Sequence, residues 1–516
     1  MKKLFALFLF TILQLSVYAQ PSIQWQKCLG GTSSEGATSI QQTTDGGYIL
    51  TGCTNSNDGD VSGKHGGQDV WVVKLDVTGT IQWHKCLGGT YFDFASSIQQ
   101  TTDGGYVLTG CTSSNTGDVS GNHGLQDIWV VKLNSSGSIQ WQKCLGGTSD
   151  EGANSIQQTT DGGYVLTGYT ESSDGDVSGF HGISYADIWV VKLDCLGTIQ
   201  WQKCLGGTNF EYGRYIQQTS DGGYIIAGHT TSNDGDVIGN YGGMDFWVVK
   251  TDSLGAIQWQ KCFGGTNGEE AYALKQTTDG GYTLTGFTAS GNGNVSGNHG
   301  GTDVWVVKLD SIGTIQWQKC LGGTSDEGAN SIQQTTDGGY VLTGYTTSNN
   351  GNVSGNHGGA DVWVVKLDST GTIQWQKCLG GTDASGEGAS SIQQTADGGY
   401  ILTGYATSND GDVSGNHGGV GDYWVIKLSS TVGMNELSSI TSLNVFPNPT
   451  NDELNIQVET SVIGSTYQLS DIIGRPITIG IITEKESRIS LQGLSSGTYL
   501  FSIGDQIRKT LKVVKE

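Results

Sequence analysis

The stretch that decides the fold runs from Asp69 to Leu87 and reads DVWVVKLDVTGTIQWHKCL. It holds two tryptophans, one in a W-V-V-K segment and one in an I-Q-W segment. Copies of it recur along the chain with a period of about 58 residues and small insertions in two repeats. The 14 tryptophans of the chain all belong to these copies: Trp25, Trp71, Trp83, Trp129, Trp141, Trp189, Trp201, Trp247, Trp259, Trp305, Trp317, Trp363, Trp375 and Trp424.

Each repeat predicts four short strands and no helix. In the first complete repeat the predicted strands are Ser39–Thr43, Tyr48–Cys53, Asp69–Leu75 and Thr80–Leu87. Asp45-Gly46-Gly47 lies between the first two and suits the positive φ angles of a tight hairpin turn. Four antiparallel strands per repeat, repeated many times, are typical of the blades of a β-propeller.

The two ends of the array indicate how the ring closes. The array starts with a lone fourth strand, Ile23 to Leu29, and ends after a third strand at Leu428. Six complete blades lie between, and pairing the terminal strands makes a seventh and removes the unpaired edges. We therefore predict an all-β fold, with a seven-bladed β-propeller over residues 20–428 that is closed by its N- and C-terminal strands. A linear solenoid would need distinct capping repeats, which the sequence lacks.

The repeat also has a family resemblance. The pattern D-x-W-V-V-K-L-D-x-x-G-x-I-Q-W, followed by L-G-G and D-G-G-Y-x-L-T-G, resembles the β-propeller repeat family called SBBP over about residues 22–428. That resemblance implies a fold but no single activity.

The N-terminal segment has the pattern of an export signal. Lys2 and Lys3 precede a mostly apolar run from Leu4 to Leu15, and Val17-Tyr18-Ala19 suits cleavage, so residues 1–19 are predicted to be a signal peptide. No stretch is apolar enough over the roughly 20 residues of a membrane-spanning helix. The formal net charge of -23 disfavours nucleic acid as a partner. We expect an exported monomer.

The composition changes near residue 430. A Ser/Thr-rich linker is predicted at 429–442, followed by a small β-sandwich domain over 443–516. Its predicted strands are Leu443–Phe446, Glu453–Val458, Ser465–Ser470, Ser487–Leu491, Gly497–Ile503 and Lys509–Val514.

This C-terminal region resembles the type A sorting domain of type IX secretion. The resemblance is carried by V-F-P-N-P-T at 445–450, D-I-I-G at 471–474, L-S-S-G-T-Y at 494–499 and the final K-V-V-K. It implies that the type IX machinery is a partner, and that the chain passes through the periplasm and is then attached to the cell surface or released. The motif residues are Pro447, Asn448, Pro449, Gly474, Gly497, Tyr499, Lys512 and Lys515.

Seven of the ten cysteines share one repeat position. Equivalent positions in a ring stay far apart, so we interpret these residues as small buried hydrophobic side chains rather than a disulfide framework. The seven are Cys28, Cys86, Cys144, Cys204, Cys262, Cys320 and Cys378.

The long loops of every repeat are predicted to open on one face of the ring. Their consensus N-D-G-D-V-S-G-x-H-G-G supplies pairs of acidic residues, which calcium could use as oxygen ligands. Asp and Asn also form turns by bonding their own backbone, and we favour that interpretation, with calcium as the alternative. The loop histidine, such as His65, and the aspartate that opens the third strand, such as Asp69, are interpreted as structural. The acidic pairs are Asp58 and Asp60, Asp174 and Asp176, Asp234 and Asp236, and Asp410 and Asp412.

A single ligand site in a ring of like blades requires departures from the repeat. Arg214 is the only arginine of the predicted propeller, and several aromatic departures lie near it. We predict a ligand-binding sector in the third and fourth blades, mostly on the long-loop face, for a sugar, a peptide or an anionic group. Drift among repeats is the alternative, and the adjacent Glu269 and Glu270 are interpreted as solvated loop residues. The candidate ligand-binding residues are Tyr185, Phe210, Tyr212, Arg214, Tyr215, His229 and Tyr241.

The sequence contains no nucleophile motif, Walker loop or H-E-x-x-H pattern. A non-catalytic binding or adhesion module for an extracellular glycan or protein is therefore the leading hypothesis. The first alternative is a polysaccharide-active hydrolase or lyase on the long-loop face, which requires an acid/base group beside Arg214 or His229. The second is a structural coat component.

Overall fold

The computed structural model describes residues 20–182, 185–418, 420–430, 443–458, 463, 465–471, 475–503 and 509–516. The predicted signal peptide, residues 431–442 of the predicted linker and Gly474 lie outside this described part. Residues 20–430 form one compact unit, and the described residues from 443 onward belong to another. All elements in the described part are β-strands.

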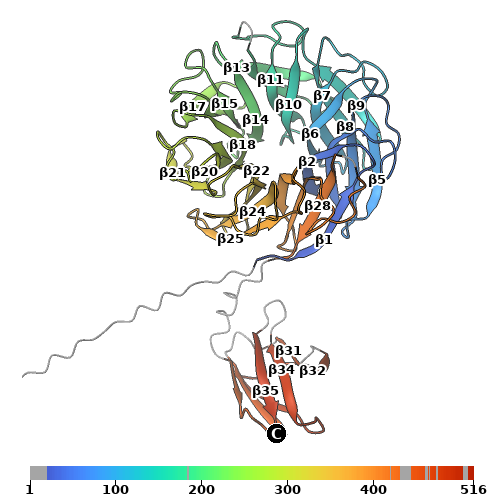
Figure 1. The fold of residues 1–516 in the computed structure, drawn as a ribbon, viewed down its shortest axis with the longest axis vertical. Helices are drawn as coiled ribbons and strands as arrows, with labels where there is room; N and C mark the ends of the chain where they lie inside the picture. The colour runs from blue at the N-terminus through green and yellow to red at the C-terminus, as the bar shows by residue number, and fades with distance from the viewer. Residues whose placement is uncertain are drawn as a thin grey trace, which may run out of the picture. The chain divides into compact units, whose positions relative to one another are not determined.

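The larger unit is a ring of seven four-stranded antiparallel sheets, as predicted (Figure 1). Blade 1 contains β2 (Glu35–Gln42), β3 (Tyr48–Thr54), β4 (Asp69–Leu75) and β5 (Ile81–Leu87). Blade 2 contains β6 (Asp93–Gln100), β7 (Tyr106–Thr112), β8 (Asp127–Leu133) and β9 (Ile139–Leu145). Blade 3 contains β10 (Glu151–Gln158), β11 (Tyr164–Thr170), β12 (Asp187–Leu193) and β13 (Ile199–Leu205). Blade 4 contains β14 (Glu211–Gln218), β15 (Tyr224–Thr230), β16 (Asp245–Thr251) and β17 (Ile257–Phe263). Blade 5 contains β18 (Glu269–Gln276), β19 (Tyr282–Thr288), β20 (Asp303–Leu309) and β21 (Ile315–Leu321). Blade 6 contains β22 (Glu327–Gln334), β23 (Tyr340–Thr346), β24 (Asp361–Leu367) and β25 (Ile373–Leu379).

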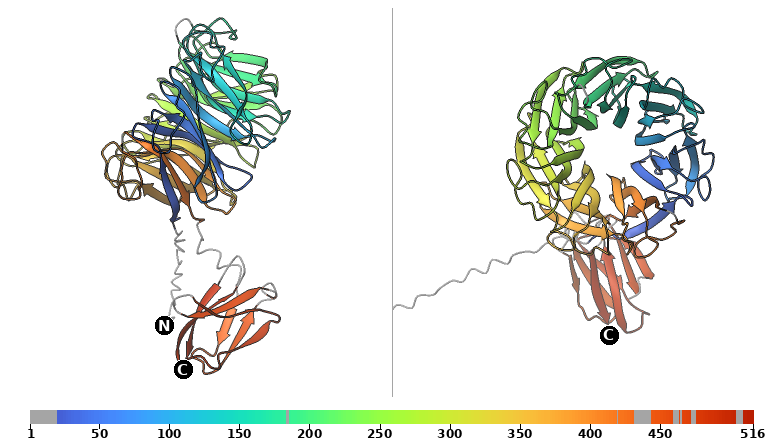
Figure 2. Two further views of the ribbon diagram at one scale, coloured as in Figure 1. Left: turned by 90° about the vertical axis from the view of Figure 1, so that its right-hand side faces the viewer. Right: turned by 45° about the horizontal axis from the view of Figure 1, so that its top comes forward.

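Blade 7 closes the ring with strands from both ends of the array. It contains β26 (Gly388–Gln394), β27 (Tyr400–Ala406), β28 (Asp422–Leu428) and, as its outer strand, β1 (Ile23–Leu29). The backbone N–H of Ser429 donates to the carbonyl of Ser22 at 2.8 Å and extends this pairing. Figure 2 shows the resulting ring from a second direction. β1 pairs with β28 in antiparallel register, so strands from both ends of the array share one sheet.

The hydrophobic core lies between neighbouring blades rather than inside each one. Ile49 and Val72 of blade 1, for example, pack with Leu108 and Trp129 of blade 2 in one buried cluster. The indole Nε1 of Trp129 donates to Oε1 of Gln142 at 2.9 Å, so its polar atom stays paired despite full burial. Each blade is therefore stable only against its neighbours.

The innermost strand of each blade begins earlier than the prediction. In blade 1 it starts at Glu35 instead of Ser39, and Glu35, Gly36 and Ala37 pair with β3 before a bulge at residue 38. The sequence hid this because Glu-Gly-Ala carries no strand-favouring side chain. Glu35 is buried, and its carboxylate accepts hydrogen bonds from Thr54 at 2.7 Å and from the Gly31 N–H at 2.9 Å. The loop before this strand is correspondingly shorter than predicted.

The C-terminal unit contains two sheets with a common core, as predicted for a sandwich. One sheet has the order β29-β30-β33 and the other β32-β31-β34-β35. The sequence missed only β32, where Pro476 and Gly480 obscure the strand pattern. The bounds are β29 (Leu443–Phe446), β30 (Glu453–Val458), β31 (Thr466–Asp471), β32 (Pro476–Ile481), β33 (Glu486–Ser490), β34 (Gly497–Ile503) and β35 (Lys509–Lys515).

The repeated cysteine of each outer strand is a buried free thiol, which confirms its interpretation as a core residue. Burial, together with the nearby carboxylates of Asp422 and Glu387, raises the pKa of Cys28 to about 12. Cys53 and Cys111 also have raised pKa values, again chiefly because they are buried. Cys195 alone among the ten is exposed.

These thiols should differ sharply in reactivity. The thiolate is the reactive species, so an alkylating reagent at pH 8 should modify Cys195 and leave the other cysteines of the native ring unmodified. Intact mass before and after denaturation measures the number of labels. Rapid labelling of several cysteines in the native protein would show that the blades are not packed as described.

Candidate functional site

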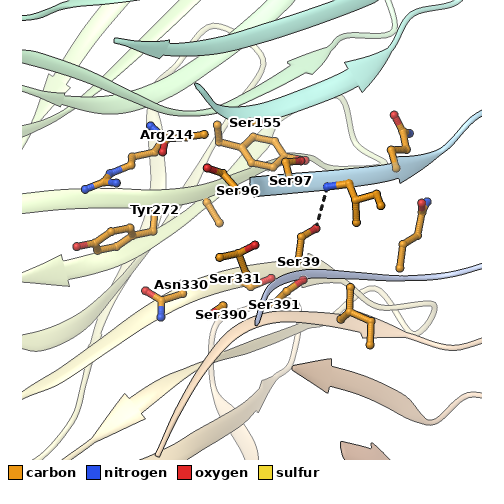
Figure 3. A pocket seen from close by; sticks show the side chains of 18 of the residues that line it. Ser39, Ser96, Ser97, Ser155, Arg214, Tyr272, Asn330, Ser331, Ser390 and Ser391 are labelled. Atoms are coloured by element: carbon orange, nitrogen blue, oxygen red, sulfur yellow. Dashed lines mark hydrogen bonds between the residues drawn. The ribbon is translucent and has the colours of Figure 1, made fainter. Parts of the chain in front are cut away.

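The seven innermost strands enclose a central cavity of about 320 Å³. One repeat position, the bulge residue of each inner strand, supplies much of its wall. Figure 3 shows Arg214 and Tyr272 close together in this wall, and Ser96, Asn330 and Ser390 elsewhere in it. The residues at this position, in blade order, are Thr38, Ser96, Asn154, Arg214, Tyr272, Asn330 and Ser390. Six are neutral polar side chains and one is a cation.

Arg214 is held in place by residues of its own blade and of blade 5. Its Nε donates to Oε1 of Glu270 at 3.1 Å, and Nη2 donates to the same oxygen. The guanidinium carbon lies 4.4 Å from the ring centre of Tyr212 and 4.9 Å from that of Tyr272. An arginine between two aromatic rings gains cation–π attraction from both. Its side chain is 26% exposed, so the oriented cation remains accessible.

His229 lies behind this arginine as a neutral, buried group. Its ring is parallel to that of Tyr212, with 5.7 Å between the ring centres, and its Nδ1 is 3.4 Å from Oε1 of Glu270. Burial lowers the pKa of His229 to about 4, Glu270 opposes this shift, and Arg214 adds to it. At neutral pH the ion pair of Arg214 and Glu270 is therefore the charged part of this group.

The structure brings together four of the candidate ligand-binding residues. Phe210 stacks on both Tyr212 and His229, and Arg214 lies on Tyr212. Tyr215 lies farther along β14 and lines the cavity. The predicted location on the long-loop face is wrong for Arg214 and Tyr215, because both lie on the innermost strand and face the cavity.

The other two candidates lie apart from this group. Tyr185 is 53% exposed and Tyr241 is 49% exposed, and within the described residues neither ring contacts the Arg214 group. The second aromatic departure forms a separate contact, in which Phe92 stacks on Phe94 with 6.3 Å between ring centres.

Three residues of blade 5 belong to the site and were not identified from the sequence. Glu270 was interpreted as a solvated loop residue, but it is the second residue of β18 and is 9% exposed. Tyr272 and Lys275 also line or support the cavity and replace the usual polar residues of the repeat. A position-by-position alignment of the inner strands would have revealed both, because E-E-A-Y-A-L-K-Q departs from E-G-A-N-S-I-Q-Q at five of eight positions.

The acidic pairs of the long loops serve mainly as hydrogen-bond acceptors within the protein. The Asp58 carboxylate accepts the N–H of Thr32 at 2.8 Å and its hydroxyl at 2.7 Å. Asp60 accepts the Gly30 N–H at 3.3 Å. Asp174, Asp234 and Asp410 repeat the contact made by Asp58. In the described part of the chain no group of three or more His, Cys, Asp or Glu is arranged to hold a metal ion. Calcium binding stays a prediction.

The loop histidines close the long loops, which confirms their structural interpretation. In blade 5, Nδ1 of His299 lies 2.6 Å from Oδ2 of Asp303, the aspartate that opens β20. The other carboxylate oxygen, Oδ1 of Asp303, is buried and has no hydrogen-bond partner among the described residues. The same orphaned oxygen recurs in all seven blades: Asp69, Asp127, Asp187, Asp245, Asp303, Asp361 and Asp422. Burial raises the pKa of Asp303, and the hydrogen bonds from His299 oppose this shift.

Blade 4 is the exception, because Tyr241 replaces the histidine. Asp245 then accepts only the backbone N–H of Tyr241 at 2.7 Å. Burial raises the pKa of Asp245 to about 7, the Tyr241 hydrogen bond opposes this shift, and Glu269 adds to it.

In the C-terminal unit the predicted sorting motifs fasten the last strand. Asn448 donates to the Lys512 carbonyl at 2.7 Å and accepts from the Val514 N–H at 2.8 Å. Nζ of Lys515 binds Asp452 at 2.7 Å and the Leu491 carbonyl at 2.9 Å. Asn448 and Lys515 therefore tie β35 to the segments around residues 448–452 and 491.

Residues 444–516 match the family model described as the secretion system C-terminal sorting domain. This domain marks export through the type IX system, so the protein reaches the cell surface or the extracellular space. No helix in the described residues is long and apolar enough to cross a membrane. Comparison with curated protein sequences finds no match.

Several solved structures resemble the chain at low identity. PorZ, described as an essential bacterial surface component of the type-IX secretion system of Porphyromonas gingivalis, aligns at 11% identity with a TM-score of 0.41. The alignment covers 95% of this chain and 60% of PorZ, so the chain spans less than two thirds of that protein. Sqt1 from Chaetomium thermophilum aligns at 10% identity and a TM-score of 0.36, with 95% of this chain and 100% of that chain covered. A putative gluconolactonase aligns at 11% identity and a TM-score of 0.33, with 65% and 88% covered.

The raised pKa of Asp245 in blade 4 predicts that the stability of the protein depends on pH. A folded-state pKa near 7, above the usual value near 4, means that the native state holds a proton that the unfolded chain releases. This contribution to stability is present below about pH 4 and is lost as the pH rises to 7. Tyr241→His should supply the missing donor and raise the free energy of unfolding at pH 8 by about 1 kcal/mol.

Thermal unfolding at pH 4.5 and pH 8 tests this expectation, with a larger gain at the higher pH. The reverse change in blade 5, His299→Tyr, is the matched variant and should destabilise the protein more at pH 8 than at pH 4.5. Equal effects at both pH values would contradict the assignment to Asp245.

Proposed function

We propose that this exported propeller is a non-catalytic binding module whose ligand enters the central cavity. The observation that carries the proposal is the chemistry of the cavity wall. Hydroxyl and amide side chains line most of it, two cations and two tyrosines line one side, and no carboxylate or histidine is among the lining residues. Such a wall can form hydrogen bonds in both directions and orient a polar ligand.

The same wall disfavours glycoside hydrolysis. That reaction uses two carboxyl groups on opposite sides of the scissile bond. Glu270 is the carboxylate that binds the wall residue Arg214; its side chain is 12% exposed, and its Oε1 accepts from the arginine. His229 is 3% exposed and covered by aromatic rings. Glu270 thus holds the arginine, and His229 packs against the aromatic rings beside it.

The departures from the repeat also occur in complementary pairs. Arg214 of blade 4 binds Glu270 and Tyr272 of blade 5, and Tyr215 of blade 4 contacts Lys275 of blade 5. Independent drift in two repeats would not match side chains across their junction. This pairing supports selection for one site.

Blocking the cavity tests the proposal. Ser390→Trp should fill the space, and bulk is tolerated at this repeat position because Arg214 and Tyr272 occupy it in blades 4 and 5. Binding of glycans and surface proteins from a broad panel to the exported protein should weaken about tenfold or more. Ser135→Trp, on an exposed turn of blade 2, is the matched control.

Two results would contradict the proposal. One is ligand binding that Ser390→Trp leaves unchanged, which would place the site on another surface. The other is the appearance of new reducing ends or unsaturated sugar ends in any polysaccharide, which would make the protein an enzyme.

A further inference from the structure

Two belts of glutamine side chains connect the inner strands at the end of the cavity near the tight turns. Each inner strand ends in two glutamines, except in blade 5. In the first belt, the side-chain oxygen of the first glutamine accepts the backbone N–H of the second glutamine in the next blade. Gln41 accepts from Gln100 at 2.7 Å, and Gln393 accepts from Gln42 at 2.7 Å across the closure. Six of the seven junctions have this bond.

The second belt is complete. There the second glutamine of each strand accepts a backbone N–H from the turn of the preceding blade, as Gln100 does from Thr44 at 2.9 Å. All seven junctions have this bond.

Lys275 is the residue that breaks the first belt. It stands where the other six blades have the first glutamine, and an ammonium group has no acceptor for the N–H of Gln334. The protein therefore lacks one hydrogen bond between blades 5 and 6 and has a half-buried cation in its place. The other six blades keep the glutamine and its hydrogen bond at this position.

The charge of Lys275 is not neutralised within the protein. The lysine of the W-V-V-K segment is paired in every blade, as when Nζ of Lys74 lies 2.9 Å from Asp45. Lys275 has no ion-pair partner among the described residues, and no carboxylate lines the cavity. Its Nζ instead donates to the hydroxyl of Tyr215 and lies 4.6 Å from that ring centre. In a chain of net charge -23, this cation lines a cavity that has no carboxylate among its lining residues.

Arg214 adds oriented donors to the same wall. Glu270 binds only its Nε and Nη2, and the two tyrosine rings hold the guanidinium plane. The remaining N–H groups have no partner among the described residues and can bind an oxygen acid.

The opposite wall offers hydroxyl groups. Ser96 of blade 2 and Ser390 of blade 7 line the cavity, and within the described residues neither hydroxyl is hydrogen-bonded. Free hydroxyls and half-buried tyrosine rings in one cavity suit a sugar, which has hydroxyls on its edge and C–H groups on its faces. A peptide would gain less here, because polar side chains make up most of the wall.

We propose that the cavity binds a carboxylate-bearing saccharide, with Lys275 binding the carboxylate and with Arg214 and the serine wall binding other oxygens of the sugar. This inference rests on the proposed binding function and specifies its ligand. A glutamine at position 275 would restore the missing hydrogen bond between blades 5 and 6, but it would remove the cation that binds the carboxylate.

The experiment measures binding of uronic acid oligosaccharides to the exported protein by calorimetry. The panel contains galacturonate, glucuronate and mannuronate oligomers, the methyl ester of each, and an oligoglutamate peptide. At least one acidic oligosaccharide should bind, and its neutral ester should bind at least about tenfold more weakly.

Three variants separate charge from structure. Lys275→Gln should lose binding about tenfold and should raise the Tm by a few degrees, roughly the effect of one restored hydrogen bond. Lys275→Met should lose binding equally without the gain in Tm. Lys261→Gln, on the exposed outer strand of blade 4, removes the same charge and should leave binding unchanged.

Each of the following results would contradict one part of the inference. Equal binding of acid and ester, or binding that Lys275→Gln leaves unchanged, overturns the anion site but leaves the binding function. Binding of the oligoglutamate alone overturns the saccharide. No binding to any oligosaccharide overturns the inference, and binding of some other ligand that Ser390→Trp abolishes would then show that the proposed function still holds.

Discussion

One junction between neighbouring blades, repeated seven times, holds this ring together. No blade has a core of its own, since residues such as Ile49 and Trp129 are buried only when two blades meet. At one end of each junction lies a buried carboxylate such as Glu35, and at the other lie the glutamine belts. Because every junction relies on the same contacts, the repeat sequence is constrained at almost every inner position.

That constraint explains where function can arise. A residue that serves all seven junctions cannot also specify one ligand, so a site must be built from positions that depart from the repeat. In this ring one group of departures lies mainly on the inner strands of blades 4 and 5, where its members contact one another. Arg214 is oriented by Glu270 and two tyrosines, and Lys275 replaces a junction residue outright.

The sequence predicted the blades well because each strand is repeated seven times with the same turn signals. The third strand from Asp69 to Leu75 was placed to the residue. The prediction placed the start of the innermost strand too late, at Ser39 instead of Glu35. The residues from Glu35 to the bulge pair through their backbone but have no strand-favouring side chains. The site was predicted in part, through Arg214 and its aromatic neighbours.

Glu270, Tyr272 and Lys275 were missed for a different reason. None of these residue types is unusual in a strand, and the role of each depends on its contacts with the neighbouring blade. The role of Lys275 becomes visible only when six hydrogen bonds between blades are seen to have a seventh position without an acceptor. Position along the chain does not reveal contacts between strands that lie about 60 residues apart.

The closure of blade 7 also governs how the protein folds. Ser22 and Ser429, which bond to each other beside β1 and β28, are 407 residues apart in the chain. Joining such distant segments is entropically unfavourable and slow, and the open ring keeps two unpaired strand edges until it happens. β1 is the first strand of the propeller in the chain, and its partner β28 is the last. The pairing of β28 with β1 therefore removes the last unpaired strand edges of the ring.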